Sequence, residues 1–208
     1  MSRIIESVKQ KQLPYVTLGL IFANVVYFII LVIGGNPSNP TYMVSKGADY
    51  APYVFENHEY WRLLTSMFMH FSFRHLSGNM IYLGIVGWTY EPVIGHLKFF
   101  LIYMLSGLGG GVVSCAYHQL THQPAVSAGA SGAVYGIIAI VIFLTFTSRT
   151  RFHAPKLFYR IAVMLVFLFY SNFVSGTGID VAAHVGGLAF GALLCFLLIP
   201  YKSNKQRQ

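Results

Sequence analysis

Charged residues are scarce in this chain of 208 residues, and acidic residues are the scarcest of them. Asp, Glu, Lys and Arg make up 10% of the sequence, against 55% hydrophobic residues, whereas soluble domains carry about 25% charged residues. Only six Asp and Glu stand against fourteen Lys and Arg. The stretch from Phe99 to Ser148 contains none of these four residue types. This composition excludes an ordinary soluble domain and indicates an all-α membrane protein.

Cysteine is almost absent too. Cys115 and Cys195 are the two cysteines, and both lie inside apolar segments. Neither belongs to a Cys-x-x-Cys or zinc-ligand pattern, so the sequence predicts no disulfide framework. We expect both side chains to be small buried hydrophobes.

The net charge of +8 does not indicate a nucleic-acid partner in this chain. The basic residues flank apolar segments, where such residues set membrane topology. No basic stripe interleaved with aromatic residues occurs outside those segments, so we expect no nucleic-acid binding.

Six apolar segments are long enough to be candidate membrane spans, because a spanning helix needs about 20 apolar residues. A long aromatic-rich connection separates the first two, and it predicts short amphipathic helices at the membrane interface as a long first outer loop. The sequence therefore predicts one six-helix membrane domain at 14–200, between a cytoplasmic segment at 1–13 and a basic cytoplasmic tail at 201–208. The expected spans are 14–34, 74–90, 98–118, 130–148, 158–174 and 181–200, and the loop is 35–73.

The distribution of Lys and Arg predicts the orientation of these spans. With a cytoplasmic N-terminus, eleven basic residues fall on the inner side and three on the outer side, which matches the positive-inside rule. Six spans then place both termini in the cytoplasm. The outer three are Lys46, Arg62 and Arg74.

This topology brings four polar residues to a similar depth under the outer surface. His75 and Asn79 lie near the outer end of the second span, and Ser131 starts the fourth. His184 lies about one turn into the sixth, at 1.5 Å rise per residue. A serine and a histidine on separate helices are the minimum parts of a nucleophile and its base.

Each member of this pair also has a purely structural interpretation. Ser131 can simply cap the start of its helix, and His184 can be a buried histidine bonded to a carbonyl. Two physical properties of these positions favour a catalytic role instead. A helix N-terminus favours developing negative charge, and an ionisable imidazole at membrane depth is a functional candidate by default.

The residues around the pair favour close packing. Gly129 and Gly132 flank Ser131 and leave room for a peptide, while Gly187 and Gly191 form a small-residue face that would bring the sixth span against the fourth. Tyr135 lies one turn after Ser131 on the same helix face and is expected near the His184 ring, although such a tyrosine is more often part of the core.

A dyad fits better than a triad, because no carboxylate is well placed as a third member. Asp180, four residues before His184, is expected to cap the sixth span and stay hydrated. His75 and Asn79, together with the Ser131 backbone N–H, are candidate donors to an oxyanion.

Metal ligation is the competing interpretation for the histidine pairs His70/His75 and His118/His122. No acidic ligands accompany them. His58-Glu59 is followed by an arginine where a zinc-protease helix needs its second histidine. We therefore expect neither a metal nor a cofactor.

Taken together, these motifs resemble those of the rhomboid family of intramembrane serine proteases, in the compact six-span form common in bacteria. The resemblance covers about residues 55–195 and shows no departure at a catalytic position. The matching residues are Glu59, Trp61-Arg62, His70 to Asn79, Gly87, Glu91, Gly95, Gly129 to Gly132, Tyr135, Ala183, His184, Gly187 and Gly191.

The resemblance implies that Ser131 is the nucleophile and His184 its base, with His75, Asn79 and the Ser131 N–H as the oxyanion site. It implies that Glu59, Trp61, Arg62 and Glu91 are structural. The expected partners are membrane lipids and protein substrates with single-pass or other transmembrane segments, cut near the outer face of a bacterial cell membrane. The alternatives are a non-catalytic module that binds transmembrane segments and a small transporter with a histidine proton relay.

Overall fold

The computed structural model describes residues 13–147 and 180–200. Within these ranges the chain is mostly helical, with a single two-stranded ladder. The long helices are α2 (Tyr15–Gly34), α6 (Phe73–Ile94), α7 (His96–Leu120), α8 (Ser131–Thr147) and α10 (Val181–Leu198). The short elements are α3 (Pro40–Ser45), β1 (Asp49–Tyr50), α4 (Ala51–Phe55), α5 (Arg62–Thr65), the 3₁₀ helix η1 (Ser66–Phe68) and β2 (Val126–Ser127).

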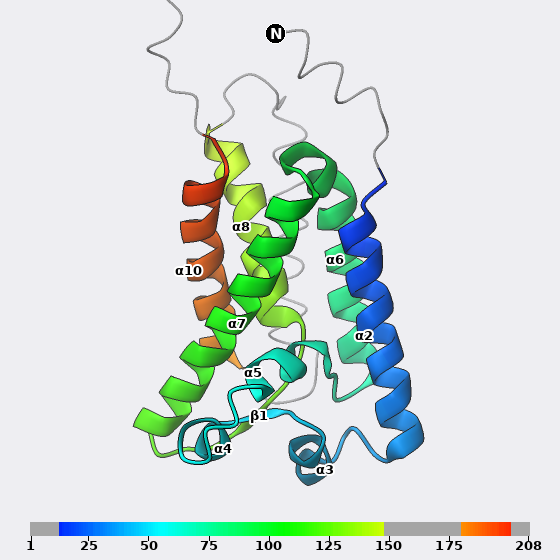
Figure 1. Ribbon diagram of the computed structural model, residues 1–208, viewed down its shortest axis with the longest axis vertical. Helices are drawn as coiled ribbons and strands as arrows, with labels where there is room; N and C mark the ends of the chain where they lie inside the picture. The colour runs from blue at the N-terminus through cyan, green and yellow to red at the C-terminus, as the bar shows by residue number, and fades with distance from the viewer. Residues whose placement is uncertain (1–12, 148–179, 201–208) are drawn as a thin grey trace, which may run out of the picture.

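The long helices form a bundle whose short elements gather at one end (Figure 1). Helices α7, α8 and α10 pack tightly against one another, while α2 packs mainly on α6, and α6 in turn contacts α8 and α7. In Figure 1, α8 and α10 begin inside the bundle, above the end where α3, α4 and α5 lie. In the first turns of these two helices, Ala133, Ala183 and His184 are buried, whereas Val181 and Val185 are exposed.

Three of the described helices are long and apolar enough to cross a membrane: α2, α7 and α10. Helix α8 is apolar but shorter. Helix α2 exposes large apolar side chains such as Phe22 and Ile33, which is typical of a helix that faces lipid. The chain thus has the helical membrane fold that its composition predicts.

Helices occupy five of the six ranges expected to span the membrane, and the sixth range, 158–174, lies outside the described residues. Three helix ends lie a few residues outside the expected spans: α6 ends at Ile94 rather than at residue 90, and α7 runs from His96 to Leu120 rather than from 98 to 118. Pro92 lies in the last turn of α6, and the helix ends two residues after it, at Ile94. Gly95 follows with φ +94°, and a glycine with positive φ is common just after a helix.

The connection at 35–73 contains α3, α4, α5 and η1, as well as a strand that the sequence did not predict. Asn39 caps α3 through its side chain, which accepts from the amides of Thr41 and Tyr42. Strand β1 pairs antiparallel with β2, in the register Asp49 with Ser127. This ladder ties the connection to the segment that leads into α8.

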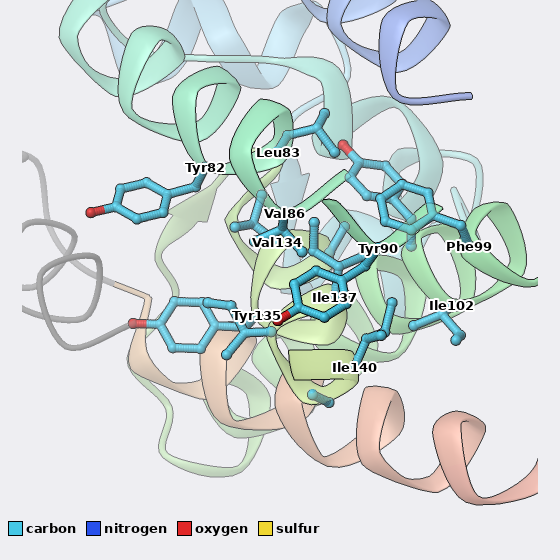
Figure 2. Packing of buried hydrophobic residues seen from close by; sticks show 14 of the residues in the cluster. Tyr82, Leu83, Val86, Tyr90, Phe99, Ile102, Val134, Tyr135, Ile137 and Ile140 are labelled. Carbon is cyan, nitrogen blue, oxygen red and sulfur yellow. The ribbon is translucent and has the colours of Figure 1, made fainter. Parts of the chain in front are cut away.

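The apolar core lies where α6, α7 and α8 meet (Figure 2). Leu83 and Val86 of α6 pack in one cluster with Phe99 of α7 and with Ile137 and Ile140 of α8. Helix α8 is buried along most of its length. The helix that carries Ser131 is therefore the centre of the bundle rather than a lipid-facing element.

Candidate active site

The Ser131 hydroxyl and the His184 imidazole form a hydrogen bond at the starts of α8 and α10. The distance from Ser131 Oγ to His184 Nε2 is 2.9 Å, within the range at which a nucleophile bonds its base. His184 is 7% exposed, and Ser131 is half-buried. Within the described residues, no hydrogen bond joins the Ser131 hydroxyl to the first amides of α8, so its observed partner is the imidazole rather than its own helix.

Glycines let the two helices approach closely enough for this bond. A methyl group added at Gly187 would lie 2.1 Å from the Gly132 carbonyl oxygen, and one at Gly191 would lie 2.4 Å from that of Gly136. Only residues without a side chain allow two helix backbones to lie this near each other. The predicted small-residue face of α10 thus lies directly on α8.

The Tyr135 ring lies flat against the His184 ring. Their centroids are 4.3 Å apart, and the planes differ by 11°. Tyr135 is 4% exposed. Tyr135 therefore lies against the His184 ring as the sequence predicted, and the stacked ring restricts rotation of the imidazole.

Gly129 holds the backbone just before Ser131 in a conformation that glycine favours, with φ +142°. Its N–H donates to the Ser66 carbonyl oxygen at 2.9 Å. A methyl group at Gly129 would lie 2.7 Å from Cε1 of His75. The His75 ring therefore packs directly on the backbone that precedes the nucleophile.

His70 also contacts this backbone, a role that the sequence did not suggest. Its Nε2 accepts from the Ala130 N–H at 3.4 Å, and its ring lies edge-on to that of His75, 5.0 Å away. Burial, reinforced by His75, lowers the pKa of His70 well below its usual value, so the ring is neutral and has the lone pair that this bond needs. Two hints in the sequence indicated that His70 matters: its spacing of five from His75, which suggested a metal pair, and its place in the matching stretch from His70 to Asn79. Neither hint predicted a bond to the Ala130 amide.

The side chain of Asn79 bonds to its own helix. Its Nδ2 donates to the His75 carbonyl oxygen at 3.1 Å, and the residue is 3% exposed. An amide carries two N–H donors, so one remains for another acceptor. His75 and Asn79 both lie in the first turns of α6, although within the described residues neither is hydrogen-bonded to Ser131.

Asp180 caps α10 as expected, accepting from the Ala183 N–H at 2.9 Å through Oδ1. Its Oδ2 also accepts from two protein hydroxyls, those of Ser114 and Ser127, which the sequence did not predict. Within the described residues, no partner contacts His184 Nδ1. Asp180 therefore does not orient the imidazole directly.

A second carboxyl group, Asp49, lies buried near Asp180. Its Oδ2 accepts from the Ser66 hydroxyl at 2.8 Å. Burial raises the pKa of Asp49 to about 7, a rise that the charge of Asp180 adds to and that the bond from Ser66 and the charge of Arg62 oppose. Cys115 of α7 also lies close enough to interact electrostatically with Asp49.

Arg62 joins the short elements of the outer connection to one another. Its guanidinium pairs with Glu59 at 2.6 Å and donates to the carbonyl oxygens of Val44 and Ala48. It also lies 4.8 Å from the centre of the Trp61 ring. Arg62 is 5% exposed, so its bonds organise the connection from within.

Glu91 caps helix α2 from the far end of α6. The fully buried carboxylate accepts from the backbone amides of Val16 and Thr17 at 2.9 and 2.8 Å and from the Thr17 hydroxyl at 2.5 Å. Its Oε1 also pairs with Nδ1 of His96 at 2.5 Å. Because Pro14 supplies no side-chain cap to α2, Glu91 provides the acceptors that this helix start requires.

The histidines that had suggested a metal site do not form a ligand group in the described part of the chain. No set of three His, Cys, Asp or Glu side chains there is arranged to hold a metal ion. His118 Nδ1 instead pairs with the carbonyl oxygen of Gln123 at 2.8 Å.

A serine hydrogen-bonded to an imidazole at the starts of two packed apolar helices defines a helical membrane protein with a site of the serine-hydrolase type. Comparison with known proteins agrees with this class. The model of the Rhomboid domain matches residues 57–201. The chain belongs to the rhomboid family, which is a family of intramembrane serine proteases.

The chain is similar to curated members of that family from bacteria and plants. It is 31% identical to Rhomboid protease GluP of Bacillus subtilis (strain 168) over 185 residues, which cover 89% of this chain and 35% of that one. It is 30% identical to Putative rhomboid protease YdcA of the same organism over 149 residues, or 72% of each chain. RHOMBOID-like protein 1 of Arabidopsis thaliana is 27% identical over 215 residues, covering 89% of this chain and 54% of its own. The matched part of the chain thus covers about a third of the length of GluP and about half the length of RHOMBOID-like protein 1.

Proposed function

We propose that this chain is an intramembrane serine endopeptidase that hydrolyses peptide bonds in or next to transmembrane segments of membrane-protein substrates. Ser131 is the nucleophile and His184 the general base. The observation that carries the proposal is the 2.9 Å hydrogen bond between Ser131 Oγ and His184 Nε2. Membership of the rhomboid family supports the same reaction class.

Acylation needs only these two side chains. Because Nε2 accepts the hydroxyl proton, the neutral imidazole carries its own proton on Nδ1. Ser131 Oγ attacks the substrate carbonyl carbon while Nε2 takes the hydroxyl proton, and a tetrahedral intermediate forms. When the C–N bond breaks, the imidazolium returns that proton to the departing amine, leaving an ester on Ser131.

The oxyanion of this intermediate requires donors near the start of α8. The N–H of Ser131 is one candidate, since the first amides of a helix have no partner within it. His75, packed on Gly129, and the second N–H of the Asn79 amide are the others. Removing one such donor typically costs about 10²–10³ in rate.

Deacylation consumes water. His184 takes a proton from a water molecule that attacks the acyl ester, and then returns it to Ser131 Oγ as the ester bond breaks. Ser131 is half-buried, which supports access of small molecules to the hydroxyl. The proposed reaction requires neither metal nor cofactor.

The proposed topology has six spans, with both termini in the cytoplasm of a bacterial cell and the active site toward the outer face. Two features support it. The starts of α8 and α10 lie toward the end of the bundle that carries α3, α4 and α5 (Figure 1), and the Lys and Arg residues are distributed eleven to three. Substrate transmembrane segments and lipids are the proposed partners.

The deciding experiment compares wild type with Ser131→Ala and His184→Ala. Each is purified in detergent and reconstituted with a model single-pass substrate, and each is also treated with a fluorophosphonate probe that labels activated serines. Wild type should cleave the substrate and be labelled, whereas both variants should lose both signals. Cys195→Ala, which removes a buried thiol far along α10 from the dyad, is the matched control and should keep both signals.

Two outcomes contradict the proposal. If wild type neither cleaves nor is labelled, the protease interpretation fails and the non-catalytic binding module becomes the better one. If cleavage survives Ser131→Ala but stops when a metal chelator is added, the chemistry belongs to a metal.

A further inference from the structure

Asp180 makes more bonds than a helix cap requires. One oxygen, Oδ1, accepts from the Ala183 N–H and completes the cap. The other, Oδ2, accepts from the hydroxyl of Ser114 on α7 and, at 2.5 Å, from that of Ser127 on β2. Hydrogen bonds to an ionised carboxylate are about twice as strong as those between neutral groups. One carboxylate therefore joins the start of α10 to the last turns of α7 and to the end of β2.

Ser127 lies four residues before the nucleophile. The segment from Ser127 to Ala130 is bonded to three different neighbours, and the first of them is Asp180. Gly129 N–H donates to the carbonyl oxygen of Ser66, and Ala130 N–H donates to His70. Of these bonds, only the one from Ser127 leads to the helix that carries His184. The bond between Ser127 and Asp180 thus links the segment that precedes Ser131 to the start of the helix that carries His184. Ser127 lies four residues before the nucleophile, and Asp180 lies four residues before the base.

We propose that Asp180 is a positioning residue for the dyad, whose Oδ2 holds Ser127, and with it the segment leading into Ser131, against the start of α10. This role rests on the proposed protease function. Asp180 does not touch the reacting atoms, since it has no bond to His184 Nδ1 within the described residues. It acts by keeping Ser131 Oγ and His184 Nε2 within bonding distance.

The two oxygens of Asp180 allow this role to be separated from capping. Asn is as good an N-cap as Asp, so Asp180→Asn can keep its oxygen on the Ala183 N–H. Its amide nitrogen then takes the place of Oδ2 and can only donate, so the charge-assisted bonds from Ser114 and Ser127 can be replaced only by weaker neutral bonds in which these hydroxyls accept. Asp180→Asn therefore weakens the link to Ser127 while the helix cap remains.

The experiment measures kcat, KM, the rate of fluorophosphonate labelling and the thermal unfolding midpoint in detergent. Ser127→Ala should lower kcat and the labelling rate by about tenfold with KM unchanged, because small misplacements of reacting groups cost rate rather than binding. Ser127→Thr keeps the hydroxyl and should restore both. Ser114→Ala is the matched control: it removes the other hydroxyl on the same oxygen, on α7 rather than on the nucleophile segment, and should change kcat less than threefold.

A double-mutant cycle makes the test specific. Asp180→Asn and Ser127→Ala act on the two ends of one bond, so the loss of kcat in the double variant should be smaller than the product of the two single losses. Additive losses, a wild-type kcat in Ser127→Ala, or failure of Ser127→Thr to restore activity would each overturn the positioning role. If Asp180→Asn does not fold, the comparison of Ser127→Ala with Ser127→Thr still decides the matter.

The outcome for wild type distinguishes this inference from the function on which it rests. If wild type cleaves and is labelled but the Ser127 variants match it, only the positioning role fails. If wild type is neither active nor labelled, the proposed function fails and the positioning role fails with it.

Discussion

Gly187→Ala should separate the two halves of the dyad. The added methyl would lie 2.1 Å from the Gly132 carbonyl oxygen, whereas ordinary contacts begin at 3.4 Å. Helix α10 must therefore move back from α8 by about 1.3 Å, the difference between these two distances. His184 lies one turn before Gly187 on the same face, so its 2.9 Å bond to Ser131 Oγ would lengthen to about 4 Å, beyond hydrogen-bonding range.

A displacement of this size should cost at least about 10²-fold in cleavage rate, because reacting groups misplaced by 1 Å lose about that much. The assay is cleavage of a reconstituted single-pass substrate, together with the rate of fluorophosphonate labelling. Gly19→Ala is the matched control, since a methyl there meets nothing within 4 Å. It should leave activity unchanged and the protein at least as stable, because Ala favours helix by about 1 kcal/mol. If Gly187→Ala retains activity within threefold of wild type, close backbone contact does not hold the dyad together.

Substitutions at three further positions test other groups in the fold. Asp49 has a pKa raised to about 7, so the folded state keeps a proton that the unfolded chain loses above about pH 4. Wild type should therefore lose up to about 1.4 kcal/mol of stability per pH unit between these values relative to Asp49→Asn, measured by unfolding midpoints in detergent, and parallel profiles would contradict this. Glu91→Gln leaves backbone amides of α2 facing an N–H donor, and should cost about 1–3 kcal/mol of stability. The folded fraction should still react with the fluorophosphonate probe, and an unchanged unfolding midpoint would refute the capping role. Tyr135→Phe keeps the ring stacked on His184 and should label nearly as wild type does, whereas Tyr135→Ala should label at least several-fold more slowly; equal rates for the two variants would exclude a role for the ring.

Much of the architecture follows from the sequence because long apolar runs determine helices almost alone. Helices α2, α7, α8 and α10 lie close to the expected ranges. Helix α6 is less apolar than the others, since its buried face includes Asn79 and Glu91. Its C-terminal extent was missed for that reason. Polar residues on a buried helix face lower the mean hydropathy of the segment, although they are packed inside the bundle.

The parts of the site that the sequence did not predict depend on contacts between distant segments. Ser127 and Asp180 are 53 residues apart, and the pairing of Asp49 with Ser127 joins two connections that have no periodicity of their own. A serine in a loop looks the same whether it faces water or a carboxylate. His70 was considered as a metal ligand and as part of the matching stretch from His70 to Asn79, but sequence spacing does not show that its acceptor nitrogen reaches the Ala130 amide.

The scarcity of acidic residues acquires a structural meaning once their partners are known. Three of the six, Asp49, Glu91 and Asp180, accept hydrogen bonds from donors on other elements of the fold. Glu91 caps α2 at one end of the bundle, and Asp180 caps α10 within it. Burying an ionised carboxylate is costly unless several donors meet it. Each of these three lies at a helix start or a junction whose donors would otherwise lack acceptors, and an amide substitution at any of the three should therefore disturb the contact between elements more than it disturbs the net charge.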